Sequence, residues 1–237
     1  MGNKFRGFPK ELFQFLRELS KNNQREWFQE HKSVYREFVV DPVCEFIAAM
    51  APRLQKVSEC FVADPRPNGG SMFRIYRDTR FSGDKRPYKE NVGCHFRHMA
   101  GKDAHAPGFY VHLESQRIFF GGGVWMPPNP VLDKIRDAIV EEPSAWASIV
   151  QNKAFMRRFG SVTGDGLKRP PRGYAADHPF VEDLKRKSFY VIQEVEESVA
   201  QTPQFIVEVE KAFMATRPLM QFLTTALELP FERKRYV

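Results

Sequence analysis

The segment from Arg74 to Lys89 gathers the side chains of this sequence that could do chemistry. It holds six bases and two acids, which are Arg74, Arg77, Arg80, Lys85, Arg86, Lys89, Asp78 and Asp84. The segment therefore carries +4 of the chain's formal net charge of +7. An arginine presents a rigid fork of N–H donors that matches a phosphate or carboxylate, and a lysine adds a compact positive charge. This composition predicts a binding site for an anion.

The residue types suggest a role for each side chain. The residues that we expect to bind the anion or to orient it are Arg74, Arg77, Arg80, Lys85 and Tyr88. Asp78 either holds one arginine in place or acts as a general base, which makes it the candidate catalytic residue. Arg172 and Tyr174 are candidates for a supporting contact around the same anion. The alternative interpretation is an Arg/Asp/Tyr network that only fastens a loop to the domain, because partly buried charges need partners.

Alternation of side chains over residues 72–81 predicts a strand. Positions 73, 75, 79 and 81 share one face, and the polar positions 74, 76, 78 and 80 share the other. Ser82, Gly83 and Asp84 then supply turn chemistry, so we expect Lys85 and Tyr88 to fold back beside the polar face.

The same segment resembles the signature of a known family. The pattern R-x-x-R-D-x-R-F-x-x-x-D-K-x-x-Y, from Arg74 to Tyr88, is similar to that of a bacterial family catalogued as Domain of Unknown Function 2461. The resemblance covers nearly the whole chain and includes Asn22-Asn23 with Trp27-Phe28, Gly121-Gly122-Gly123-x-Trp125, and Pro171-Arg172-Gly173-Tyr174 before Asp177-His178-Pro179. It implies a single domain and marks residues to test. That family has no established activity, so the resemblance assigns no role.

A second crowded span raises the question of zinc, through Cys94, His95, His98, His105 and His112. On a strand, His95 and His98 face opposite sides, and no His-x-His pair occurs. The spacing favours hydrogen-bonded or surface histidines, so we expect no metal and no cofactor.

Two shorter motifs have ordinary structural explanations. Gly121 to Gly123 lack the Gly-Lys-Ser/Thr or G-x-G-x-x-G context of a phosphate loop, which favours close packing of a strand against Trp125 or a helix. Asp177 before His178-Pro179 is more typical of a helix cap than of an acid/base pair. Asn22 and Asn23 likewise favour caps, and Trp27 and Phe28 favour the core.

These residues must be positioned by helices and strands, and the sequence pattern predicts helices at both ends of the chain. Apolar residues at helical spacing predict helices over residues 9–21, 23–40, 43–54, 130–141 and 143–160, with Asp41-Pro42 as a break or kink. Pro203 and Pro218 open two closing helices. Strict alternation predicts a strand over 109–114, and a turn at Ser115-Gln116 leads into a second strand over 117–124. We expect a last strand over 188–195 and weaker strands over 61–63 and 94–99. Residues 160–176 are rich in Gly, Pro and bases and predict a long irregular segment.

This order predicts one α+β domain over residues 1–237, with a central, mostly antiparallel sheet flanked by N- and C-terminal helices. The composition is consistent with one folded domain, because 42% of the residues are hydrophobic and the chain contains 22 Phe, which is enough to form a core. No stretch resembles a membrane span or a signal peptide, and three widely spaced cysteines fit a reducing compartment. We therefore expect a cytoplasmic protein. The sequence does not indicate its oligomeric state.

Three functions remain open, and the sequence ranks them. A pocket for a small phosphate- or carboxylate-bearing molecule, with or without an enzymatic reaction, suits the tight mixture of Arg, Asp and Tyr best. A nucleic-acid-binding module comes second, favoured by the isoelectric point of about 9.3, by aromatic residues among the bases, and by Lys168, Arg169 and Arg172. A scaffold whose charge cluster is purely architectural is the third.

Overall fold

A four-stranded antiparallel sheet lies at the centre of the computed structural model, which describes residues 5–80, 83–101 and 106–232. Its strands are β1 (Asn91–Arg97), β2 (Gly108–Glu114), β3 (Arg117–Val124) and β4 (Phe189–Val195), in the spatial order β1-β2-β3-β4. Strands β2 and β3 form the predicted hairpin, in which Glu114 pairs with Arg117 and Gln116 has a positive φ of 65°. The predicted strands at 109–114, 117–124 and 188–195 are confirmed.

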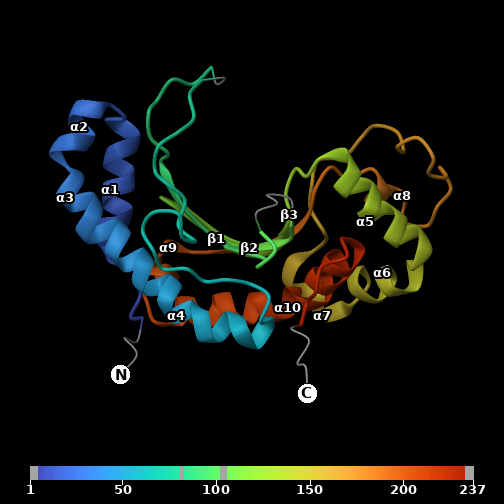
Figure 1. Cartoon of the computed structure of the whole chain (residues 1–237). Coiled ribbons are helices and arrows are strands. Elements are labelled where there is room, and N and C mark those ends of the chain that lie inside the picture. The colour runs from blue at the N-terminus through green and yellow to red at the C-terminus, as the bar shows by residue number, and fades with distance from the viewer. Residues whose placement is uncertain (1–4, 81–82, 102–105, 233–237) are drawn as a thin grey trace.

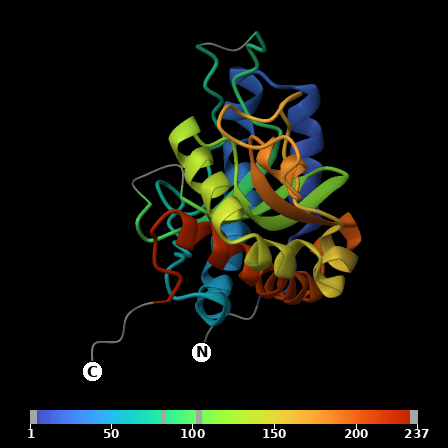
Figure 2. The same ribbon diagram turned by 90° about the vertical axis from the view of Figure 1, so that its right-hand side faces the viewer.

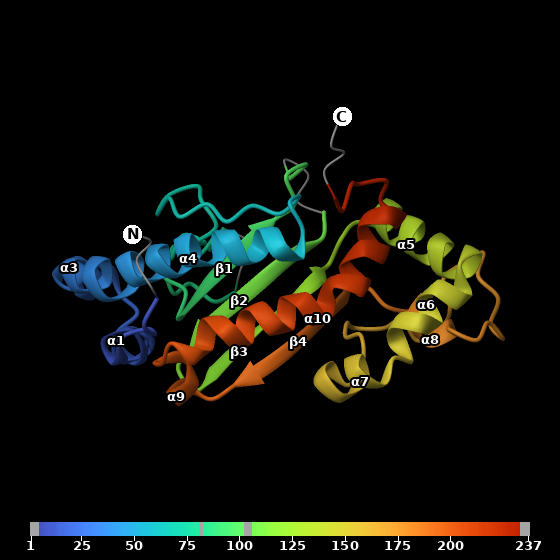
Figure 3. The same cartoon turned by 90° about the horizontal axis from the view of Figure 1, so that it is seen from below.

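One face of the sheet forms the main core. Every second side chain of β2, namely Phe109, Val111 and Leu113, is fully buried on this face. Helices α4 (Asp41–Val57) and α10 (Gln204–Ala226) cover it, as Figure 3 shows. The rings of Phe109 and Phe213 lie 4.6 Å apart between sheet and helix.

Helix α10 is a single helix with Pro218 inside it, so the prediction of two closing helices was wrong. A proline within a helix costs about 3 kcal/mol, because it lacks an N–H donor and its ring crowds the preceding turn. Beyond Pro218 the helix buries Leu219, Met220 and Leu223 completely. Burying such side chains stabilises by about 1.5–3 kcal/mol each, which outweighs the proline.

The N-terminal helices form a layer beside the sheet (Figure 1). They are α1 (Lys10–Lys21), α2 (Arg25–Glu30), α3 (Lys32–Tyr35) and a π-helical turn η1 (Arg36–Val40) that runs directly into α4. Pro42 was expected to break or kink this segment, and the chain instead stays helical through it. The wider π turn before Pro42 relieves the clash that its ring would make in a regular α-helix.

The C-terminal half contributes a second apolar cluster around Trp146, which is fully buried. Besides α10, the helices of the C-terminal half are α5 (Asn129–Glu141), α6 (Pro143–Val150), α7 (Lys153–Phe159), α8 (Val181–Leu184) and α9 (Glu197–Ala200). The single helix predicted over 143–160 is two helices, because the Asn152 side chain accepts the N–H groups of Ala154 and Phe155 and starts α7.

These elements confirm the α+β class and the central antiparallel sheet with helices from both ends of the chain. That residues 1–237 form a single domain stays a prediction. In the part of the chain that the structure describes, none of the helices has the length and apolar composition needed to span a membrane.

Candidate functional site

Residues 71–80 and 83–90, called the arm from here on, leave the β1 edge of the sheet and project beyond it (Figures 1 and 2). At its base the arm follows β1, since Phe73 N donates to Gly93 O and His95 N donates to Ser71 O. Farther out its two legs pair with each other, through Lys89 N to Ile75 O at 2.7 Å.

The strand predicted over residues 72–81 is not formed. The arm makes only isolated bridges, Met72 with Cys94 and Tyr76 with Tyr88. Two legs without a third strand or a broad apolar face lack the contacts that stabilise a regular ribbon. Phe81 and Ser82, part of the predicted strand and turn, lie outside the described residues.

Tyr88 anchors the arm to the N-terminal helices. Its side chain is buried, and its ring stacks on Phe28 of α2 at 4.1 Å between centroids. Asn23 holds its backbone from both sides: the amide Nδ2 donates to Tyr88 O at 3.0 Å, and Oδ1 accepts from Tyr88 N at 3.1 Å. Asn23 was predicted to cap a helix, but the N-cap residue of α2 is Gln24. The Asn23 amide instead binds the backbone of the arm at Tyr88. Tyr88 therefore supports the arm from within the core.

The outer half of the arm is held by internal ion pairs. Arg80 contacts the Asp78 carboxylate with both Nε and Nη2, at 3.0 and 2.7 Å, and this pair is exposed. Arg86 binds Asp84 in the same way, and Arg77 Nη1 reaches the Asp84 carboxylate at 2.7 Å. Hydrogen bonds from Arg80 hold the pKa of Asp78 below its usual value. A lowered pKa makes Asp78 a weak base and suits the supporting role better than the catalytic one.

Three cations of the arm have a different environment. Among the described residues, Arg74, Lys85 and Lys89 make no ion pair with a carboxylate. Lys85 Nζ donates to Thr79 O and Lys89 Nζ donates to Arg74 O, each at 3.0 Å. Burial, with the nearby Arg74 and Arg77, lowers the pKa of Lys89. The arm therefore holds uncompensated positive charge around Lys89.

In the described part of the chain, no helix covers the sheet face opposite α4 and α10 (Figure 1). This face holds a row of polar and aromatic side chains. In β2 these are Tyr110, His112 and Glu114, which alternate with the core residues and are half-buried. Tyr110 Oη lies 3.1 Å from His112 Nδ1, and His112 Nε2 lies 3.1 Å from Glu114 Oε2. This hydrogen-bonded series was not singled out in the sequence, although strand alternation places its three members on one face.

Phe73 joins the arm to this open face. Its ring lies 6.1 Å from that of Tyr110 and 5.8 Å from that of His95, and Lys89 Nζ lies 5.3 Å from its centre. Gly93 makes room for the junction, because a Cβ there would come within 2.6 Å of Tyr110 Oη and 2.9 Å of Phe73 Cδ2. The cations around Lys89 and the series on β2 therefore border one region.

Arg172 and Tyr174 do not join the arm. Their segment follows the opposite edge of the sheet, where Thr163 N donates to Tyr190 O of β4, and it extends over α5 and α8 (Figure 1). Tyr174 Oη donates to Asp137 Oδ1 of α5 at 2.8 Å. The structure brings together Arg74, Arg77 and the other arm residues, and separates these two from them.

The other motifs have local structural roles. A Cβ on Gly122 would lie 3.1 Å from Met220 Sδ, so this glycine allows α10 to pack closely on β3, while Trp125 is 74% exposed. His178, rather than Asp177, accepts the N–H of Phe180 before α8. His98 is buried, and its ring donates to Pro230 O at 2.7 Å. Within residues 5–80, 83–101 and 106–232, no three His, Cys, Asp or Glu side chains are grouped as a metal site would need; His105 lies outside these ranges.

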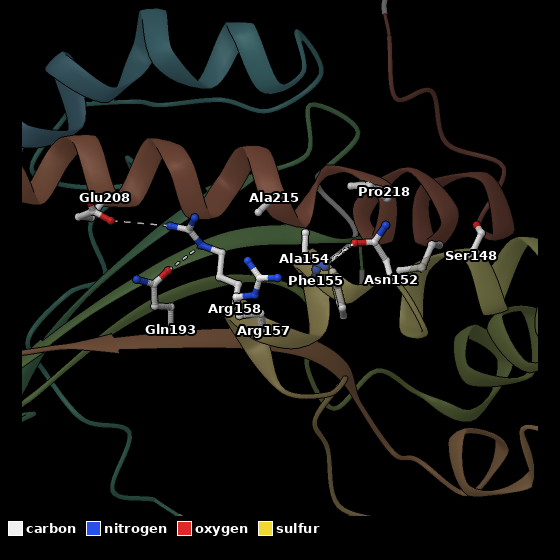
Figure 4. Close-up of a pocket in the computed structure, with 11 residues that line it drawn as sticks. Ser148, Asn152, Ala154, Phe155, Arg157, Arg158, Gln193, Glu208, Ala215 and Pro218 are labelled. Carbon is white, nitrogen blue, oxygen red and sulfur yellow. Dashed lines mark hydrogen bonds and ion pairs between the residues drawn. The ribbon is translucent and has the colours of Figure 1, made fainter.

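A cavity of about 590 Å³ lies elsewhere, between α6, α7, β4 and α10 (Figure 4). Arg158 points along it, donates to Gln193 Oε1 at 2.8 Å and lies 3.8 Å from Glu208. Sequence patterns gave no signal for it, because its lining comes from four separate elements. Arg158 faces the Glu208 carboxylate, whereas the neighbouring Arg157, which also lines the cavity, makes no ion pair among the described residues.

A family model described as conserved hypothetical protein (DUF2461) matches residues 11–222, which confirms the predicted resemblance. The comparison with curated proteins finds no match.

Proposed function

Because the chain belongs to the DUF2461 family, whose description names no activity, we propose a function from the geometry: binding of a small molecule that carries a phosphate or carboxylate group. The anion would lie at the base of the arm, where Lys89 and Arg74 border the open face of the sheet. An enzymatic role is part of the further inference below.

The observation that carries this proposal is the environment of Lys89. Its ammonium group is half-buried beside two guanidinium groups, and among the described residues its hydrogen-bond partner is a carbonyl rather than a carboxylate. Such a charge is unfavourable in isolation and becomes favourable when an anion arrives. Charged groups whose surroundings perturb them in this way are often found at functional sites.

The remaining arm residues have graded roles in this proposal. Arg77 is fixed by Asp84 at the border of the Lys89 region and adds charge to it. Arg80 and Lys85 lie near the tip and add longer-range attraction for an anion. Asp78 positions Arg80, and Tyr88 fixes the arm. Arg172 and Tyr174 take no part, because they lie at the opposite edge of the sheet.

Calorimetry with sulfate, inorganic phosphate, pyrophosphate, citrate and nucleotides tests the proposal. We expect at least one of these anions to bind, and Lys89→Met or Arg74→Met to weaken that binding about 10- to 100-fold, since a hydrogen bond to a charged group contributes about 1.5–3 kcal/mol. Lys211→Met is the matched control. It removes the same charge from an exposed lysine of α10, on the covered side of the sheet.

Two results would contradict the proposal. One is that no anion in the panel binds to the wild-type protein. The other is that Lys89→Met and Arg74→Met bind the anion as tightly as Lys211→Met does.

Single-stranded nucleic acid is the second candidate, because Phe73 and Tyr76 expose 44% and 48% of their surface beside the arm's bases. Bases stack on such rings while cations track the backbone. This function predicts that affinity for an oligonucleotide falls steeply with salt and drops in Phe73→Ala and Tyr76→Ala. Binding of mononucleotides as tight as that of oligonucleotides would exclude it.

A further inference from the structure

We propose that Tyr110, His112 and Glu114 form a proton relay, and that the chain removes a proton from the carbon next to a carbonyl group in its bound phosphate- or carboxylate-bearing molecule. This inference rests on the proposed anion site, which would hold the charged end of the substrate. In it Tyr110 is the catalytic residue, and His112 and Glu114 are positioning residues that receive and stabilise the proton.

The direction of the relay follows from its hydrogen bonds. An ionised Glu114 carboxylate only accepts, so the contact of 3.1 Å requires a proton on His112 Nε2. The other ring nitrogen, Nδ1, is then the acceptor for the Tyr110 hydroxyl, also at 3.1 Å. The Tyr110 proton therefore points to His112, and the remaining lone pair of Oη is left to accept a proton from a ligand.

The states of these groups suit a neutral relay. Burial lowers the pKa of His112, which keeps the ring neutral at pH 7 but also makes it a weaker base. The Glu114 carboxylate acts in the opposite direction and stabilises the imidazolium once it forms. Burial also raises the pKa of Tyr110, so its phenol stays protonated. Tyr110 therefore passes a proton on in a concerted step rather than acting as a phenolate.

The proton balance of the step is simple. The C–H proton of the substrate moves to Tyr110 Oη while the Oη proton moves to His112 Nδ1. The electron pair of the C–H bond becomes the enolate of the substrate. The imidazolium that forms is paired with Glu114, and the reverse sequence returns a proton from solvent to the carbon. No oxidant, reductant or further reactant is needed.

The series is held rigidly at the edge of the anion region. The His112 ring stacks on Phe119 at 4.5 Å with an interplanar angle of 11°. The side chain of His112 is 12% exposed and that of Glu114 is 36% exposed, so the proton can leave through the Glu114 end. Phe73 connects Tyr110 to Lys89, as described above.

His95 adds a donor beside Tyr110, its partner in the β1–β2 register. Burial and Arg97 lower the pKa of His95 to about 4, so its ring is neutral at pH 7. A neutral imidazole can donate its N–H to a carbonyl oxygen and stabilise the enolate.

The charged and titratable groups that face the series come from four elements. They are His95 and Arg97 of β1, Arg117 of β3, Glu194 of β4 and Lys89 of the arm. A pH–rate profile of the relay will therefore also contain the titration of Lys89 at high pH. Substitutions of Tyr110, His112 or Glu114 show which part of the profile comes from His112.

Deuterium exchange followed by proton NMR tests the reaction. Pyruvate, oxaloacetate, 2-oxoglutarate and dihydroxyacetone phosphate are incubated with the full chain in heavy water, and their binding is measured separately. We expect exchange in at least one compound that binds. The exchange rate should fall at least 100-fold in Tyr110→Phe, since a positioned acid or base contributes about 10²–10⁴-fold. In Glu114→Gln we expect kcat to fall at least tenfold with KM unchanged, and in Lys211→Met no change.

Nitrogen NMR of His112 gives an independent readout that does not need a substrate. We expect the neutral Nε2–H form at pH 7 in the wild type, and a changed Nδ1 shift in Tyr110→Phe. The proposal is overturned if His112 carries its proton on Nδ1, if compounds bind without exchange, or if Tyr110→Phe exchanges at the wild-type rate. If nothing binds, the anion site itself fails and the relay has no substrate, which is a separate outcome from binding without exchange.

Discussion

Lys89 lies in the arm beside two guanidinium groups, whereas His112 lies on the open face of the sheet between Tyr110 and Glu114. Lys89 belongs to a run of bases that is evident from the sequence. The structure adds that its ammonium group contacts a carbonyl and, among the described residues, no carboxylate. Tyr110, His112 and Glu114 were visible only as the polar side of a strand. Alternation assigns residues to a face, but it does not tell whether helices cover that face. The polar series was therefore predictable as a row, and its accessibility was not.

At the residue scale, we predict that an anion raises the pKa of Lys89. In the free protein this pKa lies below the usual value for a lysine, because burial and two guanidinium groups disfavour the charged form. Sulfate is a suitable probe, because its own charge does not change in this pH range. Its affinity should increase as pH falls between the bound and the free pKa of Lys89, and then level off.

Carbon NMR of labelled lysine side chains, assigned with Lys89→Met, measures both pKa values directly. The same lowered pKa affects stability without the anion. The charged lysine destabilises the folded state below its folded pKa, and this penalty disappears as pH rises toward the unfolded value. If sulfate leaves the pKa of Lys89 unchanged, Lys89 does not contact the bound anion and the prediction is wrong.

At the scale of elements, the first strand of the hairpin was predictable because β2 alternates cleanly over a half-buried face, while β3 and β4 alternate over part of their length. The arm was not, because its legs pair with each other over only a short stretch and are anchored by side chains that are distant in the sequence. Asn23 and Phe28 precede Tyr88 by about 60 residues, and no local pattern connects them. Pro218 misled for a related reason, since tertiary burial outweighed the local preference of proline.

We predict that Asn23→Ala loosens the arm. The substitution leaves the N–H and C=O of Tyr88 without the amide that binds them, and an unsatisfied buried backbone group costs about 1–3 kcal/mol. Hydrogen exchange should therefore show faster exchange at the Tyr88 amide, and sulfate affinity should fall. Asn22→Ala is the matched control, because the exposed Asn22 amide bonds only to Glu18 of its own helix region. Equal protection of Tyr88 in the two variants would show that Asn23 does not hold the arm.

At the scale of the whole molecule, the sheet keeps two basic segments apart. The arm follows the β1 edge, whereas Thr163 bridges Tyr190 at the β4 edge and the segment that follows, which contains Arg172 and Tyr174, extends over α5 and α8 (Figure 1). The sequence predicted the α+β class and the antiparallel sheet correctly, but it gave no strand order that could separate these segments. We predict that Arg172→Met leaves sulfate affinity within about twofold of wild type, as calorimetry would measure. A tenfold loss of sulfate affinity in this variant would show that Arg172 contributes to the anion site and would contradict the separation of the two segments.

The most direct test of the anion site is a sulfate titration followed by amide NMR on the whole chain. We expect the largest shift changes, with one common dissociation constant, at Phe73, Arg74, Arg77, Lys89 and Gly93. In Lys89→Met the same changes should require about 10- to 100-fold more sulfate. Shifts confined to residues 160–180, or to the α6–α7 cavity of Figure 4, would contradict it, as would the absence of any saturable change.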